Sequence, residues 1–342
     1  MKVRPFVKKA FPVVARATGL SSVVALRYRG RGAIFALHSV VDPSTFHPDE
    51  TLRCSEDKLE ATLRWLKRRG VDFVSLDEAM RRLSRPSAAP FAVFTFDDGY
   101  ADNLTRALPV MERFAAPFTV YVTTGMITRA IDAWWFGLAA LIRRRDKIVL
   151  PGFGHLDCSG LPGKKRSFAS IEAAIHRDFS LLARVRALID ASNIDCRALV
   201  DQEALNEHQL RRLAQHPLVT IGAHTMTHRN LAEASTETVR LEMAENRRFL
   251  QDITGTPIEH FAYPFGHARA CGEREAAIAR AVGFRTAVTT RHGQLFSEHL
   301  HHAHELPRVH LAYDDTPSSL HCKMNGVLRA VHSRFGSPIA LM

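Results

Sequence analysis

The chain has 342 residues, 46% of them hydrophobic and 24% charged, a composition that excludes a disordered or collagen-like chain. This length favours one large domain, or a domain with an insertion, over several small ones. The net charge of +11 is compatible with a polyanion, a membrane surface or a phosphate-bearing substrate. No stretch interleaves basic residues with aromatic ones, so we expect no nucleic-acid partner.

The five cysteines are far apart and odd in number, which predicts free thiols in a reducing compartment. Residues 1–30 form a basic, partly apolar segment in which we find no signal-peptide cleavage site. It is interpreted as a surface helix, with an interfacial amphipathic helix as the alternative. We find no apolar run of the roughly 18–20 residues that a membrane helix needs. We therefore expect a cytoplasmic protein, with peripheral contact to the inner membrane face as a further possibility.

Strands alternate with helices along most of the chain, which predicts βα units and a mainly parallel sheet. A buried strand over 32–41 is followed by a turn-rich loop over 42–49 and a helix that starts at Ser55 and ends at Gly70. Next come a strand (71–76), a helix (77–83), a strand (91–96), a helix (104–114) and a strand (117–125). Residues 131–206 interrupt the alternation and are predicted to be a mostly helical insertion. The remaining predicted elements are helices at 207–215, 235–254 and 274–282 and strands at 218–223, 260–263, 285–289 and 306–311.

The stretch FAVFTFDDGY at 91–100 is an apolar strand that ends in two carboxylates, Asp97 and Asp98. An unpaired buried carboxylate costs several kcal/mol or takes up a proton, so we expect these two to be used at the strand end. The alternative is a turn whose aspartates cap the next helix.

A second strand, at 218–223, is followed by HTMTH, in which His224 and His228 are four residues apart. We expect the two imidazoles to lie on one side of a helical turn. With one carboxylate they would supply three ligands of a metal site that keeps a position open for water. The alternative is an ordinary pair of surface histidines.

TFDDG (95–99), HTMTH (224–228) and YPFG (263–266) together resemble the polysaccharide deacetylases, carbohydrate esterase family 4. The resemblance covers residues 32–311 apart from the helical insertion. It implies an α/β fold, a deformed, seven-stranded (β/α) barrel, and metal-dependent removal of N-acetyl groups from sugars. It further implies that Asp98, His224 and His228 bind the metal, most commonly Zn²⁺, and that Asp97 is the general base. The backbone amide near Phe265 would donate to the oxyanion.

Two departures from the family pattern lead to further expectations. Many members have an arginine where this chain has Ala262, and we expect Arg308 to orient the base instead, the alternative being a surface arginine. The family's late histidine motif, which supplies the acid for the leaving amine, has no clear copy; His310 is near the expected place. We favour His38, because some deacetylases of biofilm polysaccharides also carry an N-terminal strand that ends in histidine. A core histidine is the alternative.

The expected domain organisation is a basic segment (1–30), a deacetylase domain (31–315) with its insertion (131–206), and a C-terminal tail (316–342). At most one of Trp134 and Trp135 would stack on a sugar, and packing of the insertion is the alternative for both. The expected activity is removal of N-acetyl groups from amino sugars of a poly- or oligosaccharide or of a lipid-linked glycan. A deformylase of a lipid-linked amino sugar and a catalytically silent sugar-binding module are the alternatives. The sequence does not predict an oligomeric state.

Overall fold

The computed structural model describes residues 12–41, 46, 53–85, 89–150, 153–175, 177–312 and 314–342. Much of the predicted basic segment and nearly all of the predicted loop at 42–49 therefore lie outside the described residues. None of the helices in this described part is long and apolar enough to cross a membrane.

The central element is a closed parallel barrel, as the sequence predicted. Pairing runs from β1 through β10, β9, β8, β7 and β4 to β3, and β3 pairs again with β1. The first strand thus closes the barrel by lying between the last and the third. A two-residue strand, β2 (Asp72–Phe73), pairs with the start of β3, where the sequence predicted a longer strand. The barrel strands are β1 (Gly32–Leu37), β3 (Phe91–Phe96), β4 (Phe118–Val122), β7 (Val219–Ala223), β8 (His260–Ala262), β9 (Thr286–His292) and β10 (Leu306–His310).

Two apolar clusters use opposite faces of these strands, because successive side chains along a strand alternate in direction. One contains Ile34, Val93, Tyr121, Val288 and Leu306, from five strands around the barrel, and therefore lies inside it. The other packs the outer faces against the helices. The interior cluster also includes apolar side chains of α4 (Leu76–Leu83), which closes one end of the barrel. The carboxyl ends of the strands, at the opposite end of the barrel from α4, are therefore available for polar side chains.

The surrounding helices match the sequence prediction except at α6 (Thr124–Thr128), which begins where the sequence predicted that the strand at 117–125 would continue. Ser55 caps the first of them by accepting a hydrogen bond from the backbone N–H of Lys58 (3.2 Å). The predicted helix at 104–114 instead begins as a π-helix, η1 (Asn103–Ala107), a form that is frequent at functional sites. The barrel helices are α3 (Glu56–Lys67), α5 (Leu108–Arg113), α6 (Thr124–Thr128), α11 (Glu207–Ala214), α12 (Thr236–Thr254) and α13 (Glu273–Val282).

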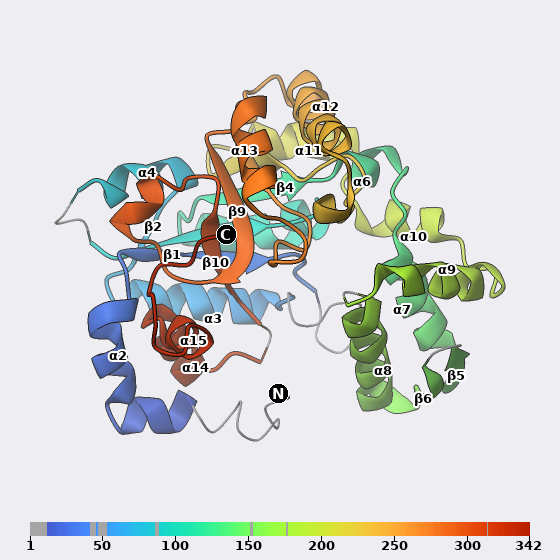
Figure 1. Cartoon of the computed structure of the whole chain (residues 1–342), viewed down its shortest axis with the longest axis horizontal. Helices are drawn as coiled ribbons and strands as arrows, with labels where there is room; N and C mark the ends of the chain where they lie inside the picture. Colours follow the sequence, from blue (N-terminus) through green and yellow to red (C-terminus); the bar gives the residue numbers. More distant parts are fainter. Residues whose placement is uncertain are drawn as a thin grey trace.

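The insertion is a helical unit with its own apolar core, and it lies beside the barrel (Figure 1). Its helices are α7 (Trp134–Arg144), α8 (Gly160–Ile175), α9 (Leu182–Asp190) and α10 (Cys196–Glu203). The sequence interpretation missed a two-stranded hairpin, β5 (Lys147–Leu150) and β6 (Gly154–Asp157). Pro162 lies in the first turn of α8, where a proline is tolerated.

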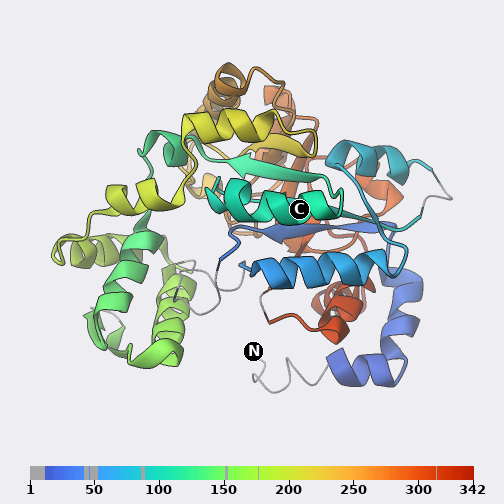
Figure 2. The same ribbon diagram turned by 180° about the vertical axis from the view of Figure 1, so that it is seen from behind.

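The two ends of the described chain form a separate layer of helices. α2 (Leu20–Tyr28) precedes the first strand, and α14 (Pro317–Met324) and α15 (Val327–His332) follow the last. Both views of the ribbon show α2 beside the C-terminal helices (Figures 1 and 2).

Candidate functional site

Strand alternation places a polar layer directly above the apolar interior of the barrel. Thr95 and Asp97 continue the inward row of Val93 on β3, and Arg308 continues the row of Leu306 on β10. These side chains lie at the carboxyl ends of parallel strands, where the functional residues of such barrels gather.

Arg308 and Asp97 form a buried, two-pronged ion pair. Nη1 donates to Asp97 Oδ1 and Nη2 donates to Asp97 Oδ2, each at 2.7 Å. Two further donors of the guanidinium are also used, because Nε donates to the carbonyl of Thr289 (2.9 Å) and Nη1 donates to Thr95 Oγ1 (3.1 Å). Arg308 is fully buried, so the alternative of a surface arginine is wrong.

This pair keeps Asp97 ionised. Burial by itself would raise the pKa of the Asp97 carboxyl, but the charge and hydrogen bonds of Arg308, with the charges of His224 and His38, outweigh that effect and lower the pKa below its usual value. Each carboxylate oxygen uses one lone pair toward Arg308 and retains another. Asp97 therefore remains able to accept a proton.

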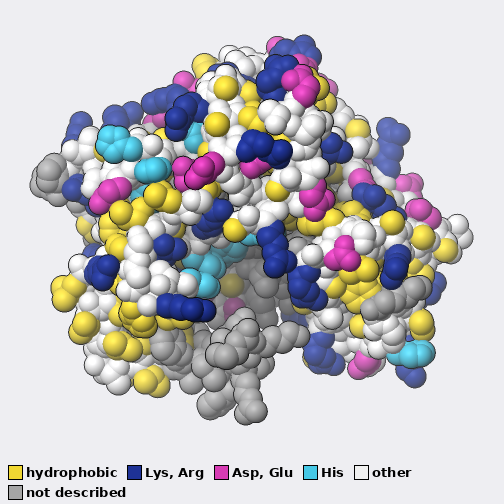
Figure 3. All heavy atoms as spheres, viewed as in Figure 1, with side chains coloured by type: hydrophobic (Ala, Val, Ile, Leu, Met, Phe, Trp, Pro, Cys, Tyr) yellow, Lys and Arg dark blue, Asp and Glu magenta, His cyan; other side chains and the backbone are white. Residues whose placement is uncertain are grey.

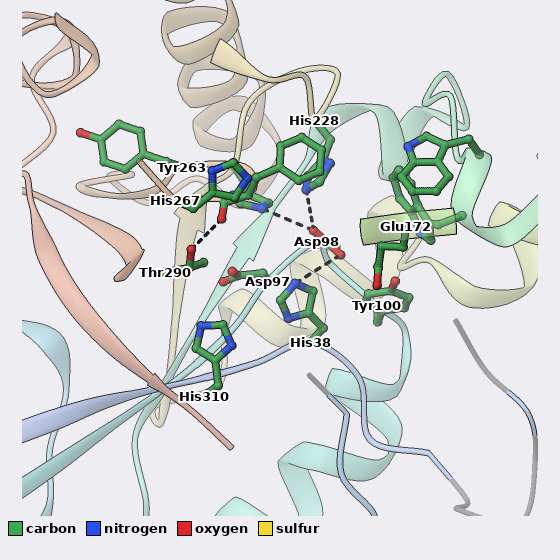
Figure 4. A pocket seen from close by; sticks show the side chains of 14 residues that line it. His38, Asp97, Asp98, Tyr100, Glu172, His228, Tyr263, His267, Thr290 and His310 are labelled. Atoms are coloured by element: carbon green, nitrogen blue, oxygen red, sulfur yellow. Dashed lines mark hydrogen bonds and ion pairs between the residues drawn. The ribbon is translucent and has the colours of Figure 1, made fainter. Parts of the chain in front are cut away.

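Asp98 points away from Arg308 and toward two histidines. Its backbone has a φ of 75°, a left-handed conformation that aspartate tolerates better than most residues. Asp98 Oδ1 lies 3.4 Å from His224 Nε2 and 3.3 Å from His228 Nε2 (Figure 4). The three ligand atoms all lie within 4.8 Å of one another, and this is the group among the described residues that could hold a metal ion.

The donor set of this triad fits a cation. His224 Nδ1 donates to the carbonyl of Ala262 (2.7 Å), which can only accept, so the lone pair of a neutral His224 is on Nε2 and faces Asp98. Asp98 Oδ1 is buried and has no hydrogen bond of normal geometry, and its distances to both rings exceed those of charge-assisted bonds. A divalent ion would satisfy all three acceptors.

The two histidines are brought together by a loop, not by a helical turn as the sequence predicted. Residues 224–228 follow β7 without helical structure, and Thr225 and His228 have left-handed φ values of 67° and 55°. The Thr225 hydroxyl accepts from the backbone N–H of His228 (3.0 Å). The spacing of four therefore reflects a tight loop closed on itself.

Two buried polar residues of α12 hold this loop, and the sequence interpretation did not identify them. Glu242 accepts from the backbone N–H groups of Met226 and Thr227 (2.8 and 2.9 Å) and from the Thr227 hydroxyl (2.6 Å). Asn246 accepts from the backbone N–H of His224 (2.8 Å). A signal was present, because 242 and 246 lie on the same helical stripe as the apolar residues 239, 243 and 250.

The two histidines considered for the acid differ in position. His38 extends the inward row of β1 and is partly exposed to the pocket, with Nε2 4.0 Å from Asp98 Oδ2 (Figure 4). His310 is deeper and packs against His292 at a ring distance of 4.9 Å. Burial, then the charges of His292 and Arg308, lower the pKa of His310 well below its usual value. His310 is therefore neutral near pH 7 and lacks the second ring proton that an imidazolium gives as an acid, which favours His38.

Phe265 lies at the pocket in a left-handed conformation with a φ of 60°. Its ring packs against His228 at 5.0 Å and against Phe179 of the insertion at 5.4 Å. The Thr290 hydroxyl donates to its carbonyl (2.6 Å), which fixes the direction of this peptide. The role of its amide toward an oxyanion stays a prediction.

The insertion forms one wall of the pocket that contains these groups. Trp134, Trp135 and Glu172 line the pocket together with the aspartates and histidines described above. Trp134 is buried, whereas Trp135 is half-buried and lies 5.4 Å from the His228 ring. The two indoles are perpendicular to one another, so they cannot both face the same flat ligand.

Comparison with known proteins gives a consistent result. The family model of polysaccharide deacetylases matches residues 84–287. YxkH of Bacillus subtilis (strain 168), which carries the name of a polysaccharide deacetylase, is 20% identical over 288 residues, covering 84% of this chain and 74% of that protein.

Two solved structures share the fold. The Streptococcus pyogenes deacetylase PplD, solved with acetate, has a TM-score of 0.56 at 18% identity, and IcaB from Ammonifex degensii has a TM-score of 0.56 at 16% identity. In both comparisons the match covers 86% of this chain and 97% of the other.

Proposed function

The chain belongs to the polysaccharide deacetylase family, and from this premise we propose that it is a metal-dependent hydrolase that removes N-acetyl groups from amino sugars. The substrate would be an N-acetylated poly- or oligosaccharide or a lipid-linked glycan. Acetate in the PplD structure supports an acetyl group as the one released.

The observation that carries this proposal is that two adjacent carboxylates have different partners. Asp97 is held by Arg308 on both oxygens, while Asp98 faces His224 and His228. A sugar-binding module without activity would have no use for a buried base held in this way. The pair instead fits a hydrolase in which one carboxylate is a ligand and its neighbour is a base.

Asp98, His224 and His228 would hold the ion, which we expect to be Zn²⁺ because nitrogen and carboxylate donors suit it. When bound, such an ion polarises an amide carbonyl and lowers the pKa of water. The hydrogen bond from His224 Nδ1 to Ala262 fixes the ring orientation for this purpose.

The other residues would transfer protons from the attacking water and to the leaving amine, and would stabilise the charge of the oxyanion. Asp97 would take a proton from the attacking water, and Arg308 would keep the carboxylate ionised and oriented. His38, across the pocket, would protonate the leaving amine. The amide of Phe265 would donate to the oxyanion. The half-exposed face of Trp135 would contact the sugar, while Trp134 packs the insertion.

The test is release of acetate from a series of N-acetylglucosamine oligomers, with zinc added or chelated, by the wild type, Asp97→Asn and His224→Ala. Both variants should lose turnover, and His224→Ala alone should also lose bound zinc, because Asp97 is not a ligand. Asp57→Asn, an exposed aspartate on α3, is the control and should behave as wild type.

Full activity of Asp97→Asn would refute the assigned base. Sugar binding by the zinc-loaded wild type without release of acetate from any oligomer would indicate a silent module. Release of formate from N-formyl amino sugars, but no acetate from the N-acetyl ones, would indicate a deformylase.

A further inference from the structure

The net positive charge of the protein comes from its two ends. Residues 1–41 contain eight Lys or Arg and residues 316–342 contain three, and neither segment contains an Asp or Glu. These eleven account for the whole net charge of +11. Residues 42–315 carry 35 basic and 35 acidic residues and are therefore neutral.

The two ends meet in space. The Tyr28 hydroxyl donates to the carbonyl of Gly336 (2.7 Å), and Asn325 Nδ2 donates to the carbonyl of Ser21 (3.2 Å). A shared buried cluster joins them and contains Ala15, Val24, Tyr28, Cys322, Val327 and Ala330. We call residues 12–31 and 316–342 the terminal layer.

The terminal layer carries most of the large hydrophobic side chains that are exposed in the described part of the chain. Of the eleven large hydrophobic side chains that are exposed in the described part of the chain, eight belong to it. On α2, Leu20, Val23 and Leu26 follow one another at helical spacing, and Leu26 is 89% exposed. The space-filling view shows hydrophobic side chains with Lys and Arg among them at the lower left, where Figure 1 has these helices (Figure 3). The eight are Val13, Val14, Leu20, Val23, Leu26, Val331, Phe335 and Leu341.

The aromatic residue Phe335, after the end of α15, has an unfavourable backbone conformation. Arg334 and Phe335 have consecutive left-handed φ values of 51° and 61°, a conformation that is uncommon for a bulky residue. Phe335 is nevertheless 60% exposed, so among the described residues only a minor part of its surface is buried to offset the cost. The neighbouring Gly336 is the residue bonded to Tyr28, which places the ring beside α2.

Exposed arginines surround these apolar side chains. Arg16, Arg27, Arg29 and Arg334 are all exposed. Burial, followed by the charges of Arg16, Arg69 and Arg29, lowers the pKa of His321 on α14, which agrees with a local excess of positive charge.

We propose that the terminal layer docks on the surface of an anionic lipid bilayer. Its apolar side chains would enter the boundary between headgroups and acyl chains, and its arginines would face anionic headgroups. A nucleic acid would use the arginines but not the aliphatic stripe. A second copy would bring two surfaces of the same charge together. This inference does not depend on the catalytic assignment, because lipid binding is measured without substrate.

The experiment is co-sedimentation of the full chain with vesicles of phosphatidylcholine alone and of phosphatidylcholine mixed with phosphatidylglycerol. The wild type should bind the anionic vesicles, less so as salt is raised. The variant Val23→Ser, Leu26→Ser, Phe335→Ser should partition about tenfold less or weaker still. Its matched control is Val149→Ser, Leu241→Ser, Leu300→Ser, which changes the three exposed hydrophobic residues outside the terminal layer and should bind as wild type.

A variant that lacks three of the exposed arginines tests the contribution of positive charge to lipid binding. Arg16→Gln, Arg27→Gln, Arg29→Gln should lose affinity for the anionic vesicles, whereas Arg144→Gln, Arg197→Gln, Arg212→Gln, also at exposed positions, should not. Thermal unfolding followed by circular dichroism verifies that each variant is folded.

The proposal is overturned if the folded wild type does not bind anionic vesicles, or if the control variants lose as much binding as the terminal-layer variants. It is equally overturned if the surface forms a dimer that the Val23, Leu26, Phe335 variant makes monomeric, or if the wild type binds duplex DNA in preference to vesicles.

Discussion

Arg308 and Asp97 are 211 positions apart in the sequence and are joined by two parallel hydrogen bonds of 2.7 Å inside the barrel. Replacing Arg308 with lysine keeps the positive charge but not the planar pair of donors, so Asp97 would lose its fixed orientation. We expect kcat to fall by about ten- to a hundredfold with the zinc content unchanged. Kinetics of acetate release and metal analysis measure the two quantities.

Arg308→Ala should in addition lower the free energy of unfolding by about 3–5 kcal/mol, because it leaves a buried carboxylate without its partner. Chemical denaturation measures this loss. Arg240→Ala, which removes an exposed ion pair with Glu237, is the control and should change stability by less than about 1 kcal/mol. A lysine variant with the kcat of the wild type would show that orientation of Asp97 does not matter.

The general acid is tested by replacing His38 and His310 separately. We expect His38→Ala to lower kcat by about 10²–10⁴-fold while zinc remains bound, because no other proton donor faces the leaving group in our assignment. His310→Gln should lower kcat by less than about tenfold, since burial already keeps this ring neutral. If the His310 variant were the inactive one and the His38 variant active, the assignment of the acid would have to be reversed.

Glu242 is predicted to act through the metal-binding loop. Both of its oxygens accept hydrogen bonds from residues 226 and 227, and glutamine can offer only one acceptor. Glu242→Gln should therefore weaken zinc binding by about ten- to a hundredfold, with kcat near that of the wild type once zinc is saturating. Competition with a chelator measures the affinity.

Glu245→Gln, on the same helix but in an exposed pair with Arg248, is the matched control and should bind zinc as the wild type does. Unchanged zinc affinity in Glu242→Gln would mean that the loop keeps its shape without this carboxylate.

Asp102 should make stability depend on pH. Burial raises the pKa of its carboxyl to about 7 in the folded protein, despite hydrogen bonds from the Ser39 hydroxyl and the Val40 backbone and the nearby charge of Arg53. Because the folded pKa lies above the unfolded one, the protonated group contributes stability at low pH, and this contribution is lost as pH rises toward 7.

Relative to Asp102→Asn, the wild type should lose about 1.4 kcal/mol of unfolding free energy per pH unit between about pH 5 and 7, and little more above that range. Urea denaturation at several pH values measures the difference. A difference that does not vary with pH would mean that Asp102 is ionised when folded.

Most of the barrel could be predicted from the sequence. Runs such as 91–96 are almost entirely apolar because the strand is buried on both faces, and the cap at Ser55 marks where its helix begins. The hairpin at 147–157 was missed because only Ile148 and Leu150 of its exposed strands are buried, which leaves little apolar pattern to recognise.

The residues of the candidate site could be predicted from the sequence, but the way they are arranged in space could not. The pattern HTMTH identified His224 and His228, yet the loop conformation depends on Glu242 and Asn246, which α12 brings from more than ten residues away. Similarly, nothing in the local sequence of Arg308 distinguishes a buried arginine from an exposed one. Its burial follows from the position of β10 beside β1 in the closed barrel.

The sequence by itself therefore determined most of the strands and helices and the residue types at the strand ends, because periodicity and capping depend on neighbours within a few positions. Only the tertiary structure decided which side chains pair: Arg308 with Asp97, Ala262 with the Nδ1 of His224, and the acid-free N-terminal segment with the acid-free C-terminal one. Those pairings are made by barrel closure, which joins positions far apart in the chain and leaves no mark in any local stretch of it.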